Sequence, residues 1–166
     1  MKKVLFILSL FVTPIITSQN MTNEKLNEIF SSVSDTIQGQ PGAWQLKIKD
    51  VTMISLTDST NNRMRIISPI IEIERLDKDL MQAALVANFH TALDVKYAIS
   101  DNILWSTFIH PLRELTEEQV QDAISQVYYA NVNFGTTFAS TSLVFPGNLS
   151  EDDEDDEKDK FEKRKF

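Results

Sequence analysis

Apolar residues recur every three or four positions in the stretch after residue 20, which predicts an amphipathic helix. The apolar stripe consists of Leu26, Ile29, Phe30, Val33 and Ile37. Thr22 or Asn23 is suited to cap the start of this helix, and Gly39 and Pro41 are expected to end it. The other face is polar, so we expect the helix to lie on the surface with one side buried.

Three runs of alternating or β-branched residues follow, and they predict three antiparallel strands in a meander. The runs cover residues 44–48, 51–56 and 63–75, with a polar turn at 58–62 between the last two. Pro69 has no N–H to donate to a ladder. We therefore expect a bulge, an edge or a bend at this position.

A second helix is predicted over residues 77–93, with apolar side chains around most of its circumference. A helix of this composition is usually buried between other elements, so we expect it to be a central core helix. The alternative is that one of its sides, which would include Phe89, meets a second subunit.

Two short apolar runs, 95–100 and 103–109, flank Asp101-Asn102. This dipeptide tolerates the positive φ angles of a two-residue hairpin turn, so the runs predict a β-hairpin. A two-residue loop also sets the register of the two strands. The expected opposite pairs are Ser100 with Ile103, Ala98 with Trp105, and Lys96 with Thr107.

Both faces of this hairpin are partly apolar. The predicted core face consists of Val95, Tyr97, Ile99, Leu104, Ser106 and Phe108. The opposite face carries Ile103, Trp105 and Ile109, which are large for a solvated surface. We expect either a partner or a terminal helix to cover them, and the sequence does not choose between the two.

A last helix begins at a capping box formed by Thr116 and Gln119 and is expected to continue to about Phe138. The complete order is α-β-β-β-α-β-β-α. The predicted fold class is therefore α+β, with an antiparallel sheet packed against helices.

The two ends of the chain differ from this domain. Lys2 and Lys3, a short apolar run and small residues before Gln19 have the layout of a secretory signal peptide. Residues 151–157 are seven consecutive acids, and such a block cannot bury enough surface to order itself. We predict a signal peptide at 1–18, a folded domain at 19–146 and a disordered acidic tail at 147–166.

The composition of the chain restricts its ligands, its location and its covalent cross-links. The formal net charge is −8 over 166 residues, which disfavours nucleic acid and anionic lipid. The apolar run near the start is too short to span a bilayer, so we expect an exported bacterial protein, periplasmic or secreted, with no membrane span after cleavage. There is no cysteine, so the fold is held without disulfides.

No catalytic motif is recognisable. His90 and His110 are the two histidines, and each is expected to be a hydrogen-bonded structural residue. With four glycines, the chain offers no phosphate-binding loop. We predict no enzyme activity, no cofactor and no metal. The alternative is a small exported hydrolase or metal-dependent enzyme that uses His90, His110 and nearby acids such as Glu72 or Asp94.

Two other charged features need an interpretation. Arg63 and Arg65 share one strand face, where they either hold a carboxylate or phosphate or balance acids across the sheet. The acidic run at 151–157 lacks the spacing of an ordered calcium loop. We expect that run to be solvated or to meet a transient basic partner.

Several segments carry a resemblance to a known superfamily. They are 62–69 (NRMRIISP), 87–94 (ANFHTALD), 97–99 (YAI), 104–112 (LWSTFIHPL) and 115–119 (LTEEQ). Together with the element order, they resemble the YbjN-type and type III secretion chaperone-like (Tir chaperone, CesT-like) superfamily over roughly residues 22–138.

This resemblance implies a small sandwich of helices on an antiparallel sheet, often a homodimer, that holds a partner polypeptide in extended form without chemistry. Secretion chaperones act in the cytoplasm, whereas the leading segment here predicts export. We therefore expect a protein-binding or chaperone-like accessory module of the periplasm or cell envelope, with a protein or peptide partner. Its predicted partner or self-association surface consists of Trp105, Ile109, Ile103, Phe89, Arg63 and Arg65.

Overall fold

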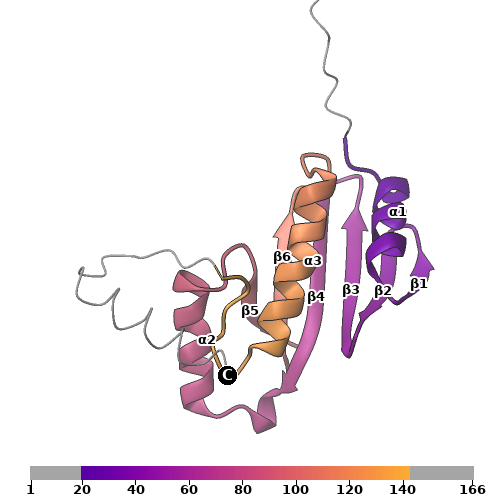
Figure 1. Ribbon diagram of the computed structural model, residues 1–166. Coiled ribbons are helices and arrows are strands. Elements are labelled where there is room, and N and C mark those ends of the chain that lie inside the picture. The colour runs from indigo at the N-terminus through magenta and orange to yellow at the C-terminus, as the bar shows by residue number, and fades with distance from the viewer. Residues whose placement is uncertain (1–19, 143–166) are drawn as a thin grey trace, which may run out of the picture.

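The computed structural model describes residues 20–142, which form a six-stranded antiparallel sheet and three α-helices (Figure 1). The strands lie in the order β1-β2-β3-β4-β6-β5. The fold class is the predicted one. The signal peptide predicted at 1–18 and the acidic tail predicted at 147–166 lie outside the described residues.

The first helix, α1 (Asn23–Val33), begins as the sequence indicates and ends earlier than predicted. The Thr22 hydroxyl accepts a hydrogen bond from the Lys25 amide and caps the start. At the other end, the amide of Asp35 already donates to Lys47 O in the sheet. Ile37 therefore belongs to a strand, β1 (Thr36–Gln40), which the predicted order lacks.

The observed order is thus α-β-β-β-β-α-β-β-α, with one strand more than predicted. β1 pairs with β2 (Ala43–Ile48) through a tight turn at Pro41-Gly42. Gly39 and Gly42 both have positive φ angles, 109° and 105°, which a residue with a Cβ rarely adopts. The predicted helix end at Gly39 and Pro41 is instead the turn of this hairpin.

The next two strands are β3 (Val51–Asp58) and β4 (Arg63–Glu72). A register shift lies between Pro69 and Ile71, which confirms the bulge expected at this proline. β4 stops at Glu72, and the rest of the predicted strand is the short 3-10 helix η1 (Ile73–Arg75).

The hairpin of β5 (Lys96–Ser100) and β6 (Ile103–His110) has the predicted two-residue turn. Asp101 and Asn102 have φ angles of 51° and 62°, as this turn requires. All three pairs expected from the register are confirmed. One side chain differs, because Ile99 on the predicted core face is 52% exposed at the free end of the edge strand.

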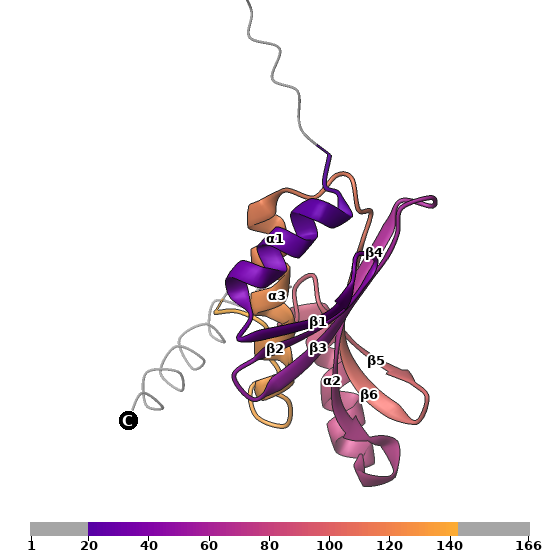
Figure 2. The ribbon, with the colours of Figure 1, turned by 90° about the vertical axis from the view of Figure 1, so that its right-hand side faces the viewer.

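The core lies between one face of the sheet and two helices, α1 and α3 (Glu117–Val132), which cover that face together (Figure 2). The Thr116 and Gln119 capping box is confirmed by both of its hydrogen bonds. α3 ends six residues before the predicted Phe138, and a turn follows. The largest fully buried side chains include Leu26, Phe30, Trp44, Leu46, Met53, Met64, Ile66, Val120 and Val127.

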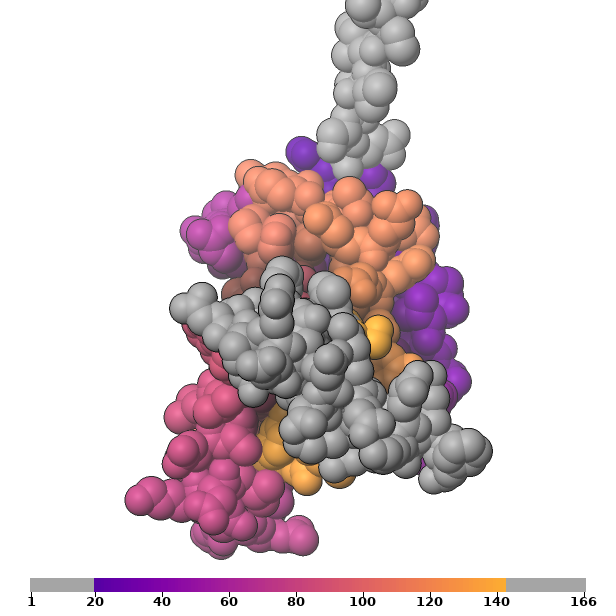
Figure 3. Space-filling view, turned by 60° about the vertical axis from the view of Figure 1, so that its left-hand side comes forward, coloured from indigo at the N-terminus to yellow at the C-terminus, as the bar shows by residue number. Residues whose placement is uncertain are grey.

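The remaining helix, α2 (Lys78–His90), lies beside the edge strand β5 and projects from the domain (Figures 1 and 3). Only Ala84 and Ala87 of this helix are buried, so the prediction of a central core helix is wrong. These two small side chains are the buried contacts of the helix, Leu80 and Met81 are half-buried, and Leu85, Val86 and Phe89 are exposed. Among residues 20–142 there is no helix with the length and apolarity needed to cross a bilayer.

Candidate protein-binding surface

The second face of the sheet has no helix over it in the described part of the chain (Figure 2). α3 lies on the other face, where the Ser106 hydroxyl donates to Val127 O at 3.2 Å. The interpretation that a terminal helix covers Trp105 and Ile109 therefore does not hold for residues 20–142. We call this second face the open face; its central side chains are Ile54, Leu56, Arg63, Arg65, Ile67, Ile103, Trp105, Thr107 and Ile109.

Two of these apolar side chains are strongly exposed and lie on either side of Arg65. Leu56 on β3 and Ile109 on β6 are both direct partners of Arg65 on β4 in the strand register. Leu56 is 40% exposed and Ile109 is 57% exposed. A shallow depression of about 360 Å³ joins these three residues with Arg63. The site thus combines apolar contact area with two cations and one carboxylate, that of Asp58.

Trp105 and Ile103 lie further along β6 and are half-buried. The indole N–H of Trp105 donates to Ser100 O at 3.0 Å. In the register, Trp105 lies between Pro69 of β4 and Ala98 of β5. An aromatic ring with its polar atom satisfied inside the protein presents a preformed apolar platform to solvent.

The two arginines on the open face have no ion pair with any residue in 20–142. The Arg63 side chain donates only to the neighbouring carbonyl of Asn62, at 3.0 Å. Asp58 is opposite Arg63 in the register, but its carboxylate accepts hydrogen bonds from the Asn61 side chain and amide. These bonds lower the pKa of Asp58. The expectation that the arginines balance acids across the sheet is not met by any ion pair among the described residues.

A second exposed apolar group lies on α2. Leu85, Val86 and Phe89 are 63%, 52% and 79% exposed. Phe89 lies four residues after Leu85 and three after Val86, the two spacings that make side chains neighbours on a helix, so Phe89 joins the three into a continuous stripe. We call it the α2 stripe. Exposed apolar patches of this kind mark interaction surfaces.

The two edges of the sheet differ in accessibility. At the β5 edge, the Asn88 side chain of α2 accepts from the Tyr97 amide at 2.7 Å and donates to Tyr97 O at 3.1 Å. Both outward backbone groups of that residue are therefore occupied. At the opposite edge, β1 pairs with β2 alone among the described residues. An added strand is thus accommodated at β1 and obstructed at β5.

Replacing Asn88 with Ala is expected to expose the β5 edge. The variant loses both hydrogen bonds to Tyr97, at a cost of about 1–3 kcal/mol. Hydrogen exchange of the Tyr97 amide should become faster, whereas the Trp44 amide in β2 should be unaffected. Unchanged protection of Tyr97 would contradict the view that Asn88 closes this edge.

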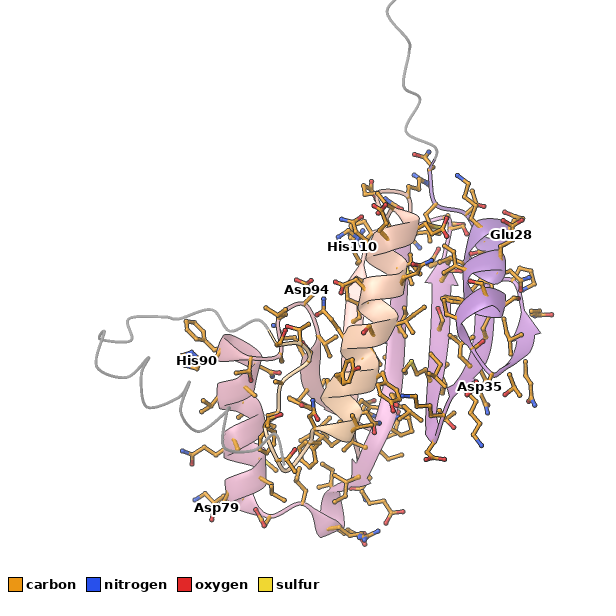
Figure 4. The ribbon with its side chains drawn as sticks, viewed as in Figure 1. Glu28, Asp35, Asp79, His90, Asp94 and His110 are labelled. Atoms are coloured by element: carbon orange, nitrogen blue, oxygen red, sulfur yellow. The ribbon has the colours of Figure 1, made fainter. Side chains whose placement is uncertain are left out.

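The residues of the hydrolase alternative do not come together. His90 is the last residue of α2, and His110 is the last residue of β6. Figure 4 shows the two histidines well apart, with Asp94 drawn between them. A cavity of about 430 Å³ is lined by His110 and Asp94 but not by His90. Within residues 20–142, no group of three or more His, Asp or Glu side chains is placed to hold a metal.

Some residues of the two apolar surfaces were not singled out by the sequence. Leu56, Leu85 and Val86 are absent from the predicted partner surface. Leu56 had a readable signal, because alternation along β3 places it on the face opposite Val51 and Met53. Leu85 and Val86 had none, because a helix that is apolar all round does not reveal its outward side.

Comparison with known proteins places the fold. No protein-family model and no curated protein matches the chain. Among solved structures, it is similar to a chain of the HopA1-SchA chaperone-effector complex, with a TM-score of 0.50 and 11% identity over 68% of this chain and 94% of that chain. A chain of the ExsC-ExsE complex has the same TM-score and identity, covering 68% of this chain and 95% of that one. The predicted likeness to type III secretion chaperones is confirmed at the level of the fold.

Proposed function

We propose that this protein is a non-enzymatic, chaperone-like module that binds an extended segment of a partner polypeptide on the open face of its sheet. One observation carries the proposal. A whole sheet face has no helix over it among residues 20–142, and exposed apolar side chains flank unpaired cations there. Exposed apolar patches rimmed by polar residues mark sites of interaction with other proteins.

The geometry suits an extended peptide better than a compact ligand. The depression at Leu56, Arg65 and Ile109 is shallow, whereas small-molecule sites are deep and enclose their ligands. Side chains of an extended peptide alternate, so one set can contact Leu56 and Ile109 while the other points to solvent. Trp105 is suited to be an anchor, because aromatic residues dominate the energetics of such interfaces.

The similar solved structures support the binding of a protein partner, but they do not identify that partner. One of them is a chaperone-effector complex, so this fold can accommodate a protein partner. At 11% identity the likeness concerns the fold, and the identity of the partner does not carry over.

Replacing Ile109 with Asp tests the open face directly. We expect at least about tenfold weaker binding of a fluorescent, permanently unfolded polypeptide, because a charge would replace a contact residue at the centre of the surface. Fluorescence anisotropy gives the dissociation constant. Tyr129→Asp is the matched control, since Tyr129 is exposed on α3, away from the open face. Equal weakening by both variants, or by neither, would argue against the open face as the binding surface.

We further propose that the protein acts in the periplasm or cell envelope after removal of residues 1–18. The arrangement of Lys2, Lys3 and the following apolar run supports export. Mass spectrometry of the protein isolated from cells should then find a mature chain that begins at Gln19. An intact chain in the cytoplasmic fraction would contradict this location.

We also propose that the protein is a homodimer, with the α2 stripe as the contact between subunits. The stripe is separate from the open face, because α2 lies beside β5 at the edge of the sheet (Figure 1). A dimer formed through α2 would leave both open faces free for partners.

A further inference from the structure

The open face has a charge opposite to that of the chain as a whole. The full chain has a formal net charge of −8. By the strand register, the described basic side chains on the open face are Lys47, Arg63, Arg65 and Lys96, and the acidic ones are Asp58 and Glu72. A basic surface on an acidic protein selects an acidic ligand.

Arg65 is the cation best placed to hold such a ligand. It lies between exposed Leu56 and Ile109, and its guanidinium makes no hydrogen bond or ion pair with any residue in 20–142. Arg63 lies two residues away on the same face of β4, and its opposite acid, Asp58, is engaged by Asn61. The ligand that fits this pair carries several carboxylates and some apolar side chains.

The chain itself contains a segment of this chemistry. Residues 151–157 are Glu-Asp-Asp-Glu-Asp-Asp-Glu, and the apolar residues Leu143, Val144 and Phe145 precede them. No other stretch of the sequence has comparable acidic density. The segment begins only nine residues after Ser142, the last described residue.

The described chain ends close to the residues that precede the edge strand β5, on the side of α1 and α3 (Figure 2), so a linker to the open face has to pass this edge. The Ser140 amide donates to Thr91 O at 3.1 Å, and its hydroxyl donates to Ala92 O at 2.8 Å. These carbonyls precede β5, whose first residue, Lys96, is on the open face. The eight residues 143–150 span up to about 28 Å when extended. This length is about twice the radius of gyration, about 14 Å, that is expected for a domain of this size.

We propose that the acidic segment 151–157 docks on the open face of its own chain, with its carboxylates at Arg63 and Arg65. The tail then occupies the surface until a partner polypeptide displaces it. Docking within one chain is favoured by a high effective concentration, in the millimolar range for a short linker. It is also weak, because each exposed ion pair contributes little, and this allows displacement.

Two consequences follow, and only the second rests on the proposed function. The tail should lie near the open face in the protein alone, and this proximity should depend on salt and on the arginines. A polypeptide that binds the open face should also bind more tightly when the tail cannot dock, because the fraction of free surface rises.

A spin label on the tail tests the first consequence in the full chain. The sequence has no cysteine, so Ser150→Cys provides a unique site for the label. We expect the label to remove most of the backbone amide signal intensity of Leu56, Arg65 and Ile109 in NMR spectra, and to leave the amides of α1 unchanged. At about 1 M salt, where the Debye length is about 3 Å, the signals should return.

Variants show whether the arginines are responsible. The double change Arg63→Gln and Arg65→Gln should restore the signals of the open face. Its matched control is Arg75→Gln with Lys78→Gln, which removes the same charge from exposed positions on η1 and α2. An unbroadened open face, or equal effects of the two pairs, would overturn the proposal. So would broadening that arises only between a labelled copy and a second, isotope-enriched copy.

The same proteins test the competition. Replacing the seven acids with Gln and Asn should tighten binding of the unfolded polypeptide by about fivefold if the tail covers the face four-fifths of the time. Unchanged affinity and no broadening would refute tail docking and leave the proposed function standing. Broadening without binding of any polypeptide would refute the proposed function and leave tail docking standing.

Discussion

Replacing Phe89 with Asp is expected to convert the proposed dimer to a monomer in solution. Phe89 is 79% exposed on α2, the highest exposure among the large apolar side chains of the described residues. In a twofold symmetric dimer each copy contributes this side chain, so the change acts twice. Losing the burial of two phenyl rings costs about 3–6 kcal/mol, a weakening of about a hundredfold or more.

Light scattering coupled to size-exclusion chromatography measures this change in mass. Val132→Asp is a suitable control, because Val132 is exposed at the end of α3, outside the α2 stripe. Circular dichroism should show that Phe89→Asp keeps its helix content, since the side chain packs on little within the monomer. A wild-type protein that stays monomeric at high micromolar concentration would rule out the dimer.

Replacing Gly39 with Ala is expected to destabilise the β1–β2 hairpin strongly. An added Cβ would lie 2.2 Å from the carbonyl oxygen of Ala43, and the residue has a φ of 109°. Steric overlap with backbone then adds to the strain of the positive φ, for a total of about 3 kcal/mol or more. Urea unfolding followed by tryptophan fluorescence, to which the buried Trp44 contributes, should show the loss as a lower midpoint.

Gly42→Ala separates the two contributions to this loss. Gly42 has a similar φ of 105°, but an added Cβ there meets no atom closer than 3.9 Å. It should therefore cost only the backbone strain, about 1–2 kcal/mol. If both substitutions lower stability equally, the close approach of Gly39 to Ala43 does not contribute.

The error at the first helix shows a limit of periodicity. Ile37 continues the helical stripe of Leu26, Phe30 and Val33, and it also alternates correctly in β1. The pattern therefore fits both elements. The structure chooses the strand because the backbone from Asp35 onward forms hydrogen bonds with β2 across the turn at Pro41-Gly42.

The candidate surface was predictable only where local geometry sets it. Trp105 and Ile109 were placed correctly on the face away from the core, because the Asp101-Asn102 turn fixes the register of two adjacent strands. Leu56 reaches the same surface from β3 through the pairing of both strands with β4. The pairing of β4 with β6 joins residues such as Arg65 and Ile109, which are more than forty positions apart, and no local signal specifies it.

Elements defined by short-range physics were therefore readable in the chain alone. These are the capping box at Thr116, the bulge at Pro69 and the two-residue turn at Asp101. The tertiary arrangement decided that both covering helices lie on one side of the sheet and that α2 lies at its edge (Figure 2). The physical reason is that burial depends on which apolar faces meet. A helix that is apolar on nearly every side, such as α2, forms its own backbone hydrogen bonds, but its sequence does not specify which side is buried. The neighbouring elements decide that.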